Sequence, residues 1–320
     1  MTTSATAPPG AAAGLTPRVA ALLMLPPLLW AGNALTGRLL ADTVPPLMLN
    51  ALRWWLAGLL LLPLGWRVLS QAHRRAELRE RWPSLLLLGG LGIGAYNALQ
   101  YQALQTSTPL NVTLIAASTP MWMMLIGRLF YGEHPTARQG LAALLSLAGV
   151  LTVLARGEWQ RLAQIELVGG DLWMLLAAIS WAFYSWQLAR PPASLRGAQR
   201  PDWTWAEFLL AQVLFGLLWA STAAGAEATL SSAYHLPSWP WSVGLVAALL
   251  FLAAGPSVLA YRCWGLGVAA AGPAVAGFFA NLTPLFAAVL SAWWLGQWPQ
   301  PYHGLAFALI VGGIVVSSRR

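Results

Sequence analysis

The chain has 320 residues, of which 58% are hydrophobic and 9% charged, and its formal net charge is +8. Soluble domains carry about 25% charged residues, so this composition excludes a soluble globular protein. The single cysteine, Cys263, excludes an internal disulfide and a cysteine-based metal cluster.

Residues 1–17 are small, polar and rich in Pro and Gly, and no charged segment precedes an apolar core there. They predict a disordered tail rather than a cleaved signal peptide. Apolar runs long enough to cross the hydrocarbon core follow almost to the C-terminus, which indicates a helical membrane protein. Divided at their Pro, Gly and Arg residues, the runs predict ten transmembrane helices, at 18–40, 46–66, 83–105, 108–130, 135–156, 168–190, 203–224, 241–264, 269–294 and 301–318.

The loops between these helices carry the orientation signal. The longest polar interruptions, 67–82, 190–202 and 225–239, are too short for a soluble domain. With the N-terminus in the cytoplasm, nearly all arginines outside the spans become cytoplasmic, and the outer side keeps Arg38, Arg156 and Arg161. Because cytoplasmic loops carry the excess of Lys and Arg, both termini are predicted in the cytoplasm. The basic charge therefore needs no nucleic-acid partner, and the expected partner is the lipid bilayer.

The chain also repeats itself. Residues 97–149 align without a gap on residues 261–313, at an offset of about 164 residues. The identities include Pro109/Pro273, Thr119/Thr283, Pro120/Pro284, Gly132/Gly296, Pro135/Pro299, Gly140/Gly304 and Gly149/Gly313. Five spans per half is an odd number, so 18–156 and 168–318 are predicted to be inverted five-helix repeats. A duplicated membrane bundle is typical of alternating-access transporters, whose substrate site lies where the repeats meet.

Pro120 and Pro284 lie near the middle of the fourth and ninth spans. Each removes the donor to the carbonyl four residues back, at Ala116 and Ala280, and opens the helix there. Two interpretations stay open: the kinks only shape the bundle, or they line the cavity and act as gating hinges.

Polar and deep aromatic side chains inside the spans predict a shared cavity, because lipid exposure would cost each polar group. Each residue could instead serve helix–helix hydrogen bonding or packing. The candidate cavity residues are Trp30, Asn33, Asn97, Tyr101, Thr119, Trp122, Trp181, Tyr184, Tyr261, Trp264 and Asn281. Deep indoles can stack on an aromatic substrate and attract its ammonium. Tryptophans near span ends, such as Trp54 and Trp55, are expected in the interfacial belt.

Arg53 lies about two turns into the second span, and its guanidinium cannot lose its proton. We expect the side chain to snorkel to the outer interface, with capture of a substrate carboxylate as the alternative. No Asp or Glu is placed at the middle of a span, so no ion coupling is visible. The sequence has no P-loop, no catalytic triad and no metal-ligand spacing, so no enzyme activity, cofactor or metal is expected.

A Trp-Ala pair lies near the middle of the first and sixth spans, at Trp30 and Trp181, and a Gly-Glu-x-Pro turn occurs at Gly132-Glu133-His134-Pro135. Together with the ten spans and the inverted halves, these motifs resemble the drug/metabolite transporter superfamily, and within it the EamA-type bacterial exporters. The second half departs from that turn with Gly296-Gln297-Trp298-Pro299, and losing the acid favours a structural role for the turn.

The resemblance implies an all-α integral membrane protein of ten helices in two inverted repeats, located in the bacterial inner membrane. It also implies export of small metabolites, with amino acids, including aromatic ones, as substrates. One chain is expected to suffice, with an oligomer left open. A lipid-handling membrane enzyme and a channel-like facilitator remain alternatives.

Overall fold

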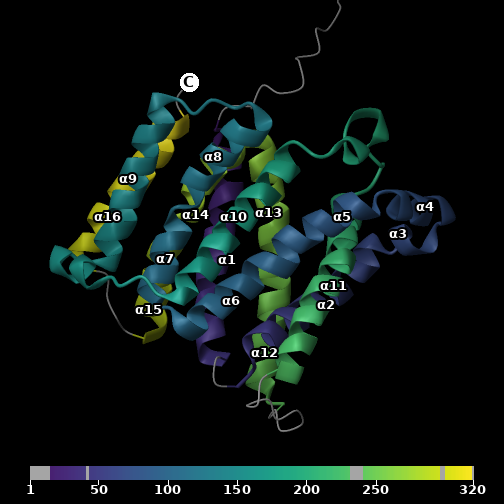
Figure 1. The fold of residues 1–320 in the computed structure, drawn as a ribbon, viewed down its shortest axis with the longest axis horizontal. Coiled ribbons are helices and arrows are strands. Elements are labelled where there is room, and N and C mark those ends of the chain that lie inside the picture. The colour runs from purple at the N-terminus through teal and green to yellow at the C-terminus, as the bar shows by residue number, and fades with distance from the viewer. Residues whose placement is uncertain (1–14, 41–42, 231–240, 296–299, 319–320) are drawn as a thin grey trace, which may run out of the picture.

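The computed structural model describes residues 15–40, 43–230, 241–295 and 300–318, and the regular structure in these ranges is entirely helical (Figure 1). The first half contains α1 (Pro17–Leu40), α2 (Pro46–Gly65), α3 (Arg67–Ser70), α4 (Ala72–Glu80), α5 (Trp82–Gly89), η1 (Gly90–Ala95), α6 (Tyr96–Thr106), α7 (Pro109–Ala117), α8 (Thr119–Tyr131) and α9 (Ala137–Leu154). After η2 (Trp159–Gln164), the second half contains α10 (Gly169–Ala189), η3 (Ala193–Leu195), η4 (Gly197–Gln199), α11 (Trp205–Leu230), α12 (Val243–Leu252), η5 (Ala253–Leu259), α13 (Ala260–Ala271), α14 (Pro273–Ala280), α15 (Thr283–Leu295) and α16 (Pro301–Ser318).

Within the described ranges, nine helical segments are long and apolar enough to cross a membrane. The third expected span, 83–105, is not among them, although it is helical throughout as α5, η1 and α6. Its second part carries Asn97, Gln100, Gln102 and Gln105, which lower its hydropathy. The chain is therefore a multi-pass helical membrane protein.

The helix α11 is longer than the sequence predicts, because residues 225–230, assigned above to a loop, continue it. Glu227 on this extension accepts hydrogen bonds from the backbone N–H groups of Leu47 (3.1 Å) and Met48 (2.9 Å), in the first turn of α2. A carboxylate at a helix N-terminus is favourable, since the unpaired N–H groups and the helix dipole attract it. The rest of that loop (231–239), the turn at 296–299 and residues 1–14 of the expected tail lie outside the described residues.

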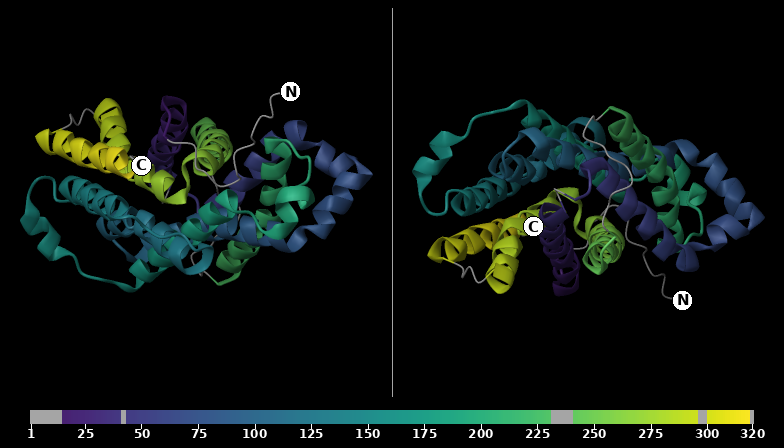
Figure 2. Two further views of the ribbon diagram at one scale, coloured as in Figure 1. Left: turned by 90° about the horizontal axis from the view of Figure 1, so that it is seen from above. Right: turned by 90° about the horizontal axis from the view of Figure 1, so that it is seen from below.

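The helices pack in two layers that do not follow the two halves of the sequence (Figure 2). From the first half, α1 packs on α13, α14 and α15, and α2 packs on η5 and α12. From the second half, α10 packs on α6, α7 and α8, and α11 packs on α5 and η1. Each half therefore exchanges its first two long helices with the other. The layers meet along two edges, where α9 packs on α16 and α2 packs on α11.

The edge formed by α9 and α16 shows a local twofold relation. A Cβ on Gly149 would lie 2.9 Å from the carbonyl oxygen of Ala306, and a Cβ on Gly313 would lie 2.8 Å from that of Ala142. Ala142 and Gly149 are the repeat equivalents of Ala306 and Gly313, so these are two copies of one contact. The numbering rises on one helix as it falls on the other, so the helices cross antiparallel. An inverted repeat requires this arrangement.

Further equivalent features follow the repeat. The π-helices η1 and η5 interrupt matching segments, and α8 and α15 begin at the equivalent residues Thr119 and Thr283. Two further equivalent pairs touch across the layers. The rings of Trp30 and Trp181 lie 5.3 Å apart between centroids, and the amide of Asn281 donates to the carbonyl of Ala117 at 3.2 Å. The pseudo-twofold axis therefore passes between the layers near the centre of the bundle.

The expected interfacial position of Trp54 is wrong, since its side chain is completely buried, whereas its neighbour Trp55 is 53% exposed. The ring of Trp54 meets Tyr261 of α13 edge-on, with the centroids 4.9 Å apart. The position of a residue along a span predicts its depth in the membrane, but not which side of the helix its side chain lies on. The side chain of Trp54 lies on the side of α2 that faces the core.

We expect Gly149→Ala to destabilise the protein. The new methyl group would lie 2.6 Å from Ile310 Cγ1 and 2.9 Å from the Ala306 carbonyl, so α9 and α16 would have to separate. Overpacking of this kind costs about 1–3 kcal/mol, which should lower the apparent unfolding temperature in detergent. The matched control is Gly140→Ala on the same helix, where no atom lies within 4 Å. Equal unfolding temperatures for the two variants would contradict close packing at this edge.

Candidate functional site

A cavity of about 710 Å³ lies between the two layers. Its walls come from the C-terminal half of α1, the start of α2, from α6 and α7, from the end of α9, and from the first three turns of α15. These parts lie away from the ends of α2, α5 and α11 that carry the arginine-rich α3 and α4. The cavity therefore occupies one side of the bundle.

The cavity wall combines amide, hydroxyl and aromatic groups, and no charged side chain is among the described residues that line it. Its polar members are Asn33, Asn97, Gln100, Tyr101, Gln105, Thr113, Thr119, Asn281, Thr283 and Ser291, and its aromatic members are Trp30, Tyr96, Tyr101 and Trp181. Both halves of the sequence contribute, as expected for a site between repeats.

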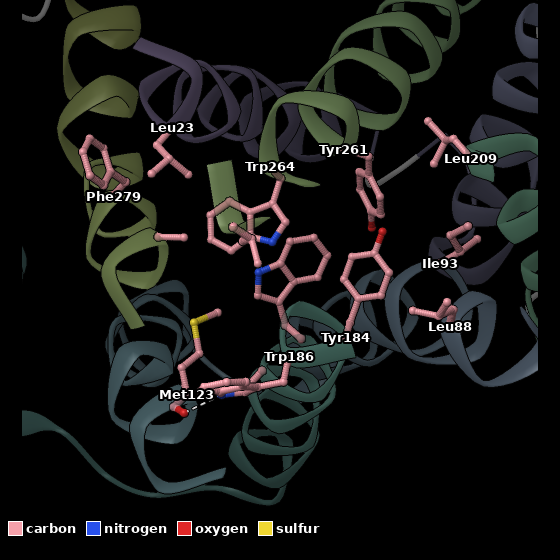
Figure 3. Packing of buried hydrophobic residues seen from close by; sticks show 14 of the residues in the cluster. Leu23, Leu88, Ile93, Met123, Tyr184, Trp186, Leu209, Tyr261, Trp264 and Phe279 are labelled. Atoms are coloured by element: carbon pink, nitrogen blue, oxygen red, sulfur yellow. Dashed lines mark hydrogen bonds between the residues drawn. The ribbon is translucent and has the colours of Figure 1, made fainter. Parts of the chain in front are cut away.

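Trp181 is the centre of an aromatic cluster at the inner end of the cavity. Its ring centroid lies 4.9 to 5.4 Å from the rings of Trp30, Tyr96, Tyr184, Tyr261 and Trp264. Tyr184 and Tyr261 point their hydroxyl ends toward one another, and Trp264 lies beside them (Figure 3). These three rings contact Trp181 but do not line the cavity, so they lie behind its wall.

Each of the three rings behind the wall has a polar anchor. Tyr184 donates to Gln212 Oε1 (3.1 Å), Trp264 donates to Ser185 Oγ (3.1 Å), and Tyr261 donates to the carbonyl of Gly92 in η1. Buried Tyr and Trp polar atoms usually find such partners. These rings therefore hold Trp30 and Trp181 in place rather than forming the wall themselves.

Beyond this cluster the two layers close on each other. A Cβ on Gly277 of α14 would lie 2.8 Å from Met123 Sδ and 3.2 Å from Pro120 Cα, both on α8. Met123 is completely buried, and its carbonyl accepts a hydrogen bond from the indole of Trp186 at 2.7 Å (Figure 3). The two layers are therefore closely packed at this end, and neither Met123 nor Gly277 lines the cavity.

The two Thr-Pro pairs break their helices in the same way. Pro120 cannot donate to the carbonyl of Ala116, and the hydroxyl of Thr119 donates to that oxygen instead, at 2.6 Å. In the second half Thr283 donates to the carbonyl of Ala280 at 2.7 Å. Both threonines line the cavity. The threonine hydroxyl thus replaces the hydrogen bond that the following proline removes.

Arg53 does not snorkel, so that expectation is wrong. Its side chain is 1% exposed, because the guanidinium finds partners on three other spans. Nε donates to Ser257 Oγ (3.0 Å) in η5, and Nη1 donates to Asn33 Oδ1 (2.9 Å), Asn97 Oδ1 (3.2 Å) and the Tyr101 hydroxyl (3.2 Å). Three of these four partners line the cavity. The fixed charge therefore lies one side chain behind the wall.

The structure brings many, but not all, of the predicted site residues to the wall. Those that line the cavity are Trp30, Asn33, Asn97, Tyr101, Thr119, Trp181, Asn281 and Pro284. Those that do not are Arg53, Pro120, Trp122, Tyr184, Tyr261 and Trp264. Trp122 lies on α8 at the closed end and donates to Ser118 Oγ at 3.1 Å. Trp122 does not line the cavity as predicted. The repeat predicts how deep a residue lies along its span, but not whether its side chain faces the cavity.

Sequence reasoning missed Tyr96, Gln100, Gln105, Thr113, Thr283 and Ser291 on the cavity wall. The sequence contains a pattern that could have identified Gln100 and Gln105 as cavity residues. With Asn97 and Tyr101 they follow helical spacing, so all four share one face of α6. A polar stripe along an otherwise apolar span points to a cavity, since lipid would not solvate it.

A multi-pass helical bundle with duplicated halves, and a polar and aromatic cavity that both halves line, is the architecture of a membrane transporter. Residues 18–155 and 168–319 each match the model of the EamA-like transporter family. The chain belongs to that family, with one match in each half.

Named relatives and a solved structure agree with this assignment. An aromatic amino acid exporter, YddG of Ancylobacter novellus, is 28% identical over 91% of this chain and 93% of its own length. The inner membrane transporter YedA of Escherichia coli K12, whose function is uncharacterised, is 26% identical over 90% of this chain and 87% of its own. One crystal structure shares the fold with a TM-score of 0.72 and 23% identity, covering 94% of this chain and 97% of that one.

We expect Thr119→Val to destabilise the protein by about 1–3 kcal/mol, because the Ala116 carbonyl then loses the hydroxyl that stands in for the missing N–H of Pro120. Adding Pro120→Ala should recover most of that loss, since residue 120 would again donate an N–H to this carbonyl. Unfolding temperatures of both single variants and the double variant test the coupling. Purely additive effects would show that the threonine does not replace the missing N–H.

Proposed function

We propose that the protein exports small metabolites, with amino acids, including aromatic ones, as its substrates. The observation that carries this proposal is the cavity of about 710 Å³, which both halves line and which one end closes. Its volume lies within the range of about 300–1,000 Å³ found for small-molecule sites. The rings of Trp30, Tyr96 and Trp181 offer stacking surfaces for an aromatic side chain. The name of the relative YddG supports the same substrate class.

We further propose ten spans in the bacterial inner membrane, with both termini in the cytoplasm. In this orientation α3, α4 and the arginines at 190–200 are cytoplasmic, as the positive-inside rule favours. The cavity, which lies on the opposite side, then faces outward, in the state from which an exported substrate leaves. The inner membrane relative YedA supports this location.

In the proposed mechanism, the two layers move so that the cavity faces each side of the membrane in turn. Opening the present closed end would separate Met123 and Pro120 on α8 from Gly277 on α14. The helix breaks at Pro120 and Pro284 lie next to this contact and the cavity, where they can act as hinges. One chain contains the whole cavity, so a monomer suffices for this cycle.

Cysteine labelling tests the orientation. On a background of Cys263→Ser, we expect Arg75→Cys on α4 to resist a membrane-impermeant maleimide in intact cells and to react after lysis. Thr229→Cys, exposed at the end of α11, should react in intact cells. Labelling of position 75 from outside would overturn the proposed topology.

Counterflow in proteoliposomes tests the function. We expect unlabelled amino acid inside the vesicles to accelerate uptake of labelled phenylalanine or tryptophan, because a carrier returns faster when loaded. The proposal would be contradicted if none of the amino acids tested accelerated uptake from the opposite side of the membrane. Fast uptake without trans-stimulation would favour a channel-like facilitator, and lipid turnover without transport would favour a lipid-handling enzyme.

The same assay tests the wall residue Trp30. Losing one stacking ring weakens binding by about 1 kcal/mol, so Trp30→Ala should raise the apparent KM for aromatic substrates more than for small aliphatic ones. The matched control is Trp173→Ala on α10, because Trp173 is exposed and does not line the cavity. An equal rise for every substrate would show that Trp30 only packs against Trp181 and Trp264.

A further inference from the structure

Arg53 forms no ion pair within the part of the chain that the structure describes. Its four hydrogen-bond partners, on α1, α6 and η5, are all neutral. The ion pairs of Arg74, Arg81 and Arg190 lie elsewhere, and none involves Arg53. A contact with the face of Trp54, with Cζ 5.4 Å from the ring centroid, adds only a weak attraction.

An uncompensated buried cation is unfavourable, because neutral hydrogen bonds only partly replace its hydration. The guanidinium cannot relieve this by losing a proton. The cavity beside it offers no relief either, since no acidic side chain is found among the described lining residues. Whatever enters the cavity therefore meets a positive potential that the protein leaves unbalanced.

Asn33 transmits this charge to the wall. Its Oδ1 accepts from Arg53 Nη1 (2.9 Å), and the Tyr101 hydroxyl also points to this oxygen (3.4 Å). With the oxygen held there, the amide N–H groups of Asn33 are turned away from the guanidinium. An anion at the wall would meet these donors with the charge of Arg53 behind them, and charge-assisted donors are the strong ones.

A substrate ammonium has no matching site. The described wall offers it only neutral oxygens and the faces of Trp30, Tyr96 and Trp181, while Arg53 repels it. From this asymmetry we infer that the cavity recognises its substrate through a carboxylate balanced by Arg53 and does not require the substrate's amine. The inference deepens the proposed function and depends on it only in that the cavity is the substrate site.

The predicted ligand class is therefore an aromatic monocarboxylate, with or without an α-amino group. A hydroxy or keto acid analogue of an aromatic amino acid should bind as tightly as the amino acid. An aromatic amine that lacks the carboxylate should bind at least about tenfold more weakly, which corresponds to 1.4 kcal/mol.

A binding series on the purified protein tests this without assuming transport. Thermal shifts are measured with phenylalanine, phenyllactate and phenethylamine, which share one ring and differ in charged groups. We expect phenylalanine and phenyllactate to stabilise the protein at similar concentrations and phenethylamine to do so only at tenfold higher ones. Equal or tighter binding of phenethylamine would overturn the inference and leave export of amino acids standing. Absence of a shift with all three compounds would overturn the inference as well, whereas counterflow decides on export separately.

Variants of Arg53, measured with the same three compounds, provide a second test of the inference. Arg53→Gln keeps hydrogen-bond donors but removes the charge, so the preference for phenyllactate over phenethylamine should disappear. Arg53→Lys keeps the charge and should keep the preference, even though it loses the planar geometry of the guanidinium. The control is Arg79→Gln, which removes a positive charge from the exposed surface of α4, outside the cavity wall, and should leave the order of the ligands unchanged. An unchanged preference in folded Arg53→Gln would overturn the role of the charge. If that variant does not fold, the wild-type series and Arg53→Lys still decide.

Discussion

A backbone carbonyl without a donor costs several kcal/mol inside a membrane, because no water is available to replace a missing N–H. This chain removes such a donor at Pro120 and at Pro284. Each time the preceding threonine supplies its hydroxyl, at 2.6 and 2.7 Å. Because this donor belongs to the break itself, the carbonyl four residues before each proline needs no partner from lipid or from a neighbouring helix. A kink of this kind can also open further while the carbonyl keeps its partner.

The same need of each carbonyl for a hydrogen-bond donor explains why equivalent residues meet at the centre of the bundle. The broken end of α7 leaves the carbonyl of Ala117 available, and the amide of Asn281, its repeat equivalent, donates to it. That amide also donates to Ser146 Oγ at 2.8 Å, which connects the break to α9. The pseudo-twofold axis is thus marked by polar contacts at the centre and by glycine contacts at the α9–α16 edge. Since the first two long helices of each half lie in the opposite layer, relative motion of the layers also moves the two halves against each other.

Much of the fold could be predicted from the sequence. A helix that crosses lipid needs a long apolar segment, and the internal repeat predicts helix breaks at equivalent positions in both halves. The bounds of α16 agree with the expected span 301–318, and α8 and α15 begin at the Thr-Pro pairs. The exchange of helices between layers was not readable, since periodicity says nothing about which neighbour a buried face meets.

The cavity wall was readable in part, for a related reason. Depth along a span follows from counting residues, so the central position of Trp30, Asn97 and Trp181 could be predicted. Rotation does not follow from counting, which is why Trp54 and Trp122 were misplaced. The burial of Arg53 depends on partners from three other spans, and a single span cannot reveal them.

The repeat gives the two halves common breaks and contacts but not a common set of polar groups. Positions that are identical in both halves form the breaks at Pro120/Pro284 and the close helix contacts at Gly149/Gly313, and the equivalent Trp30 and Trp181 both line the cavity. Positions that differ make the wall asymmetric: Asn97 is equivalent to Tyr261, and Gln100 to Trp264.

In both of these pairs the first-half residue lines the cavity and the second-half residue lies in the aromatic layer behind it. Ser257, which holds Arg53, is equivalent to the apolar Ile93. A symmetric scaffold thus carries an asymmetric site, with polar groups concentrated around α6 and Arg53 and aromatic support coming from α10 and α13. A substrate with one charged end and one aromatic end matches that asymmetry, because only one orientation places its carboxylate near Arg53 and its ring against Trp30 and Trp181.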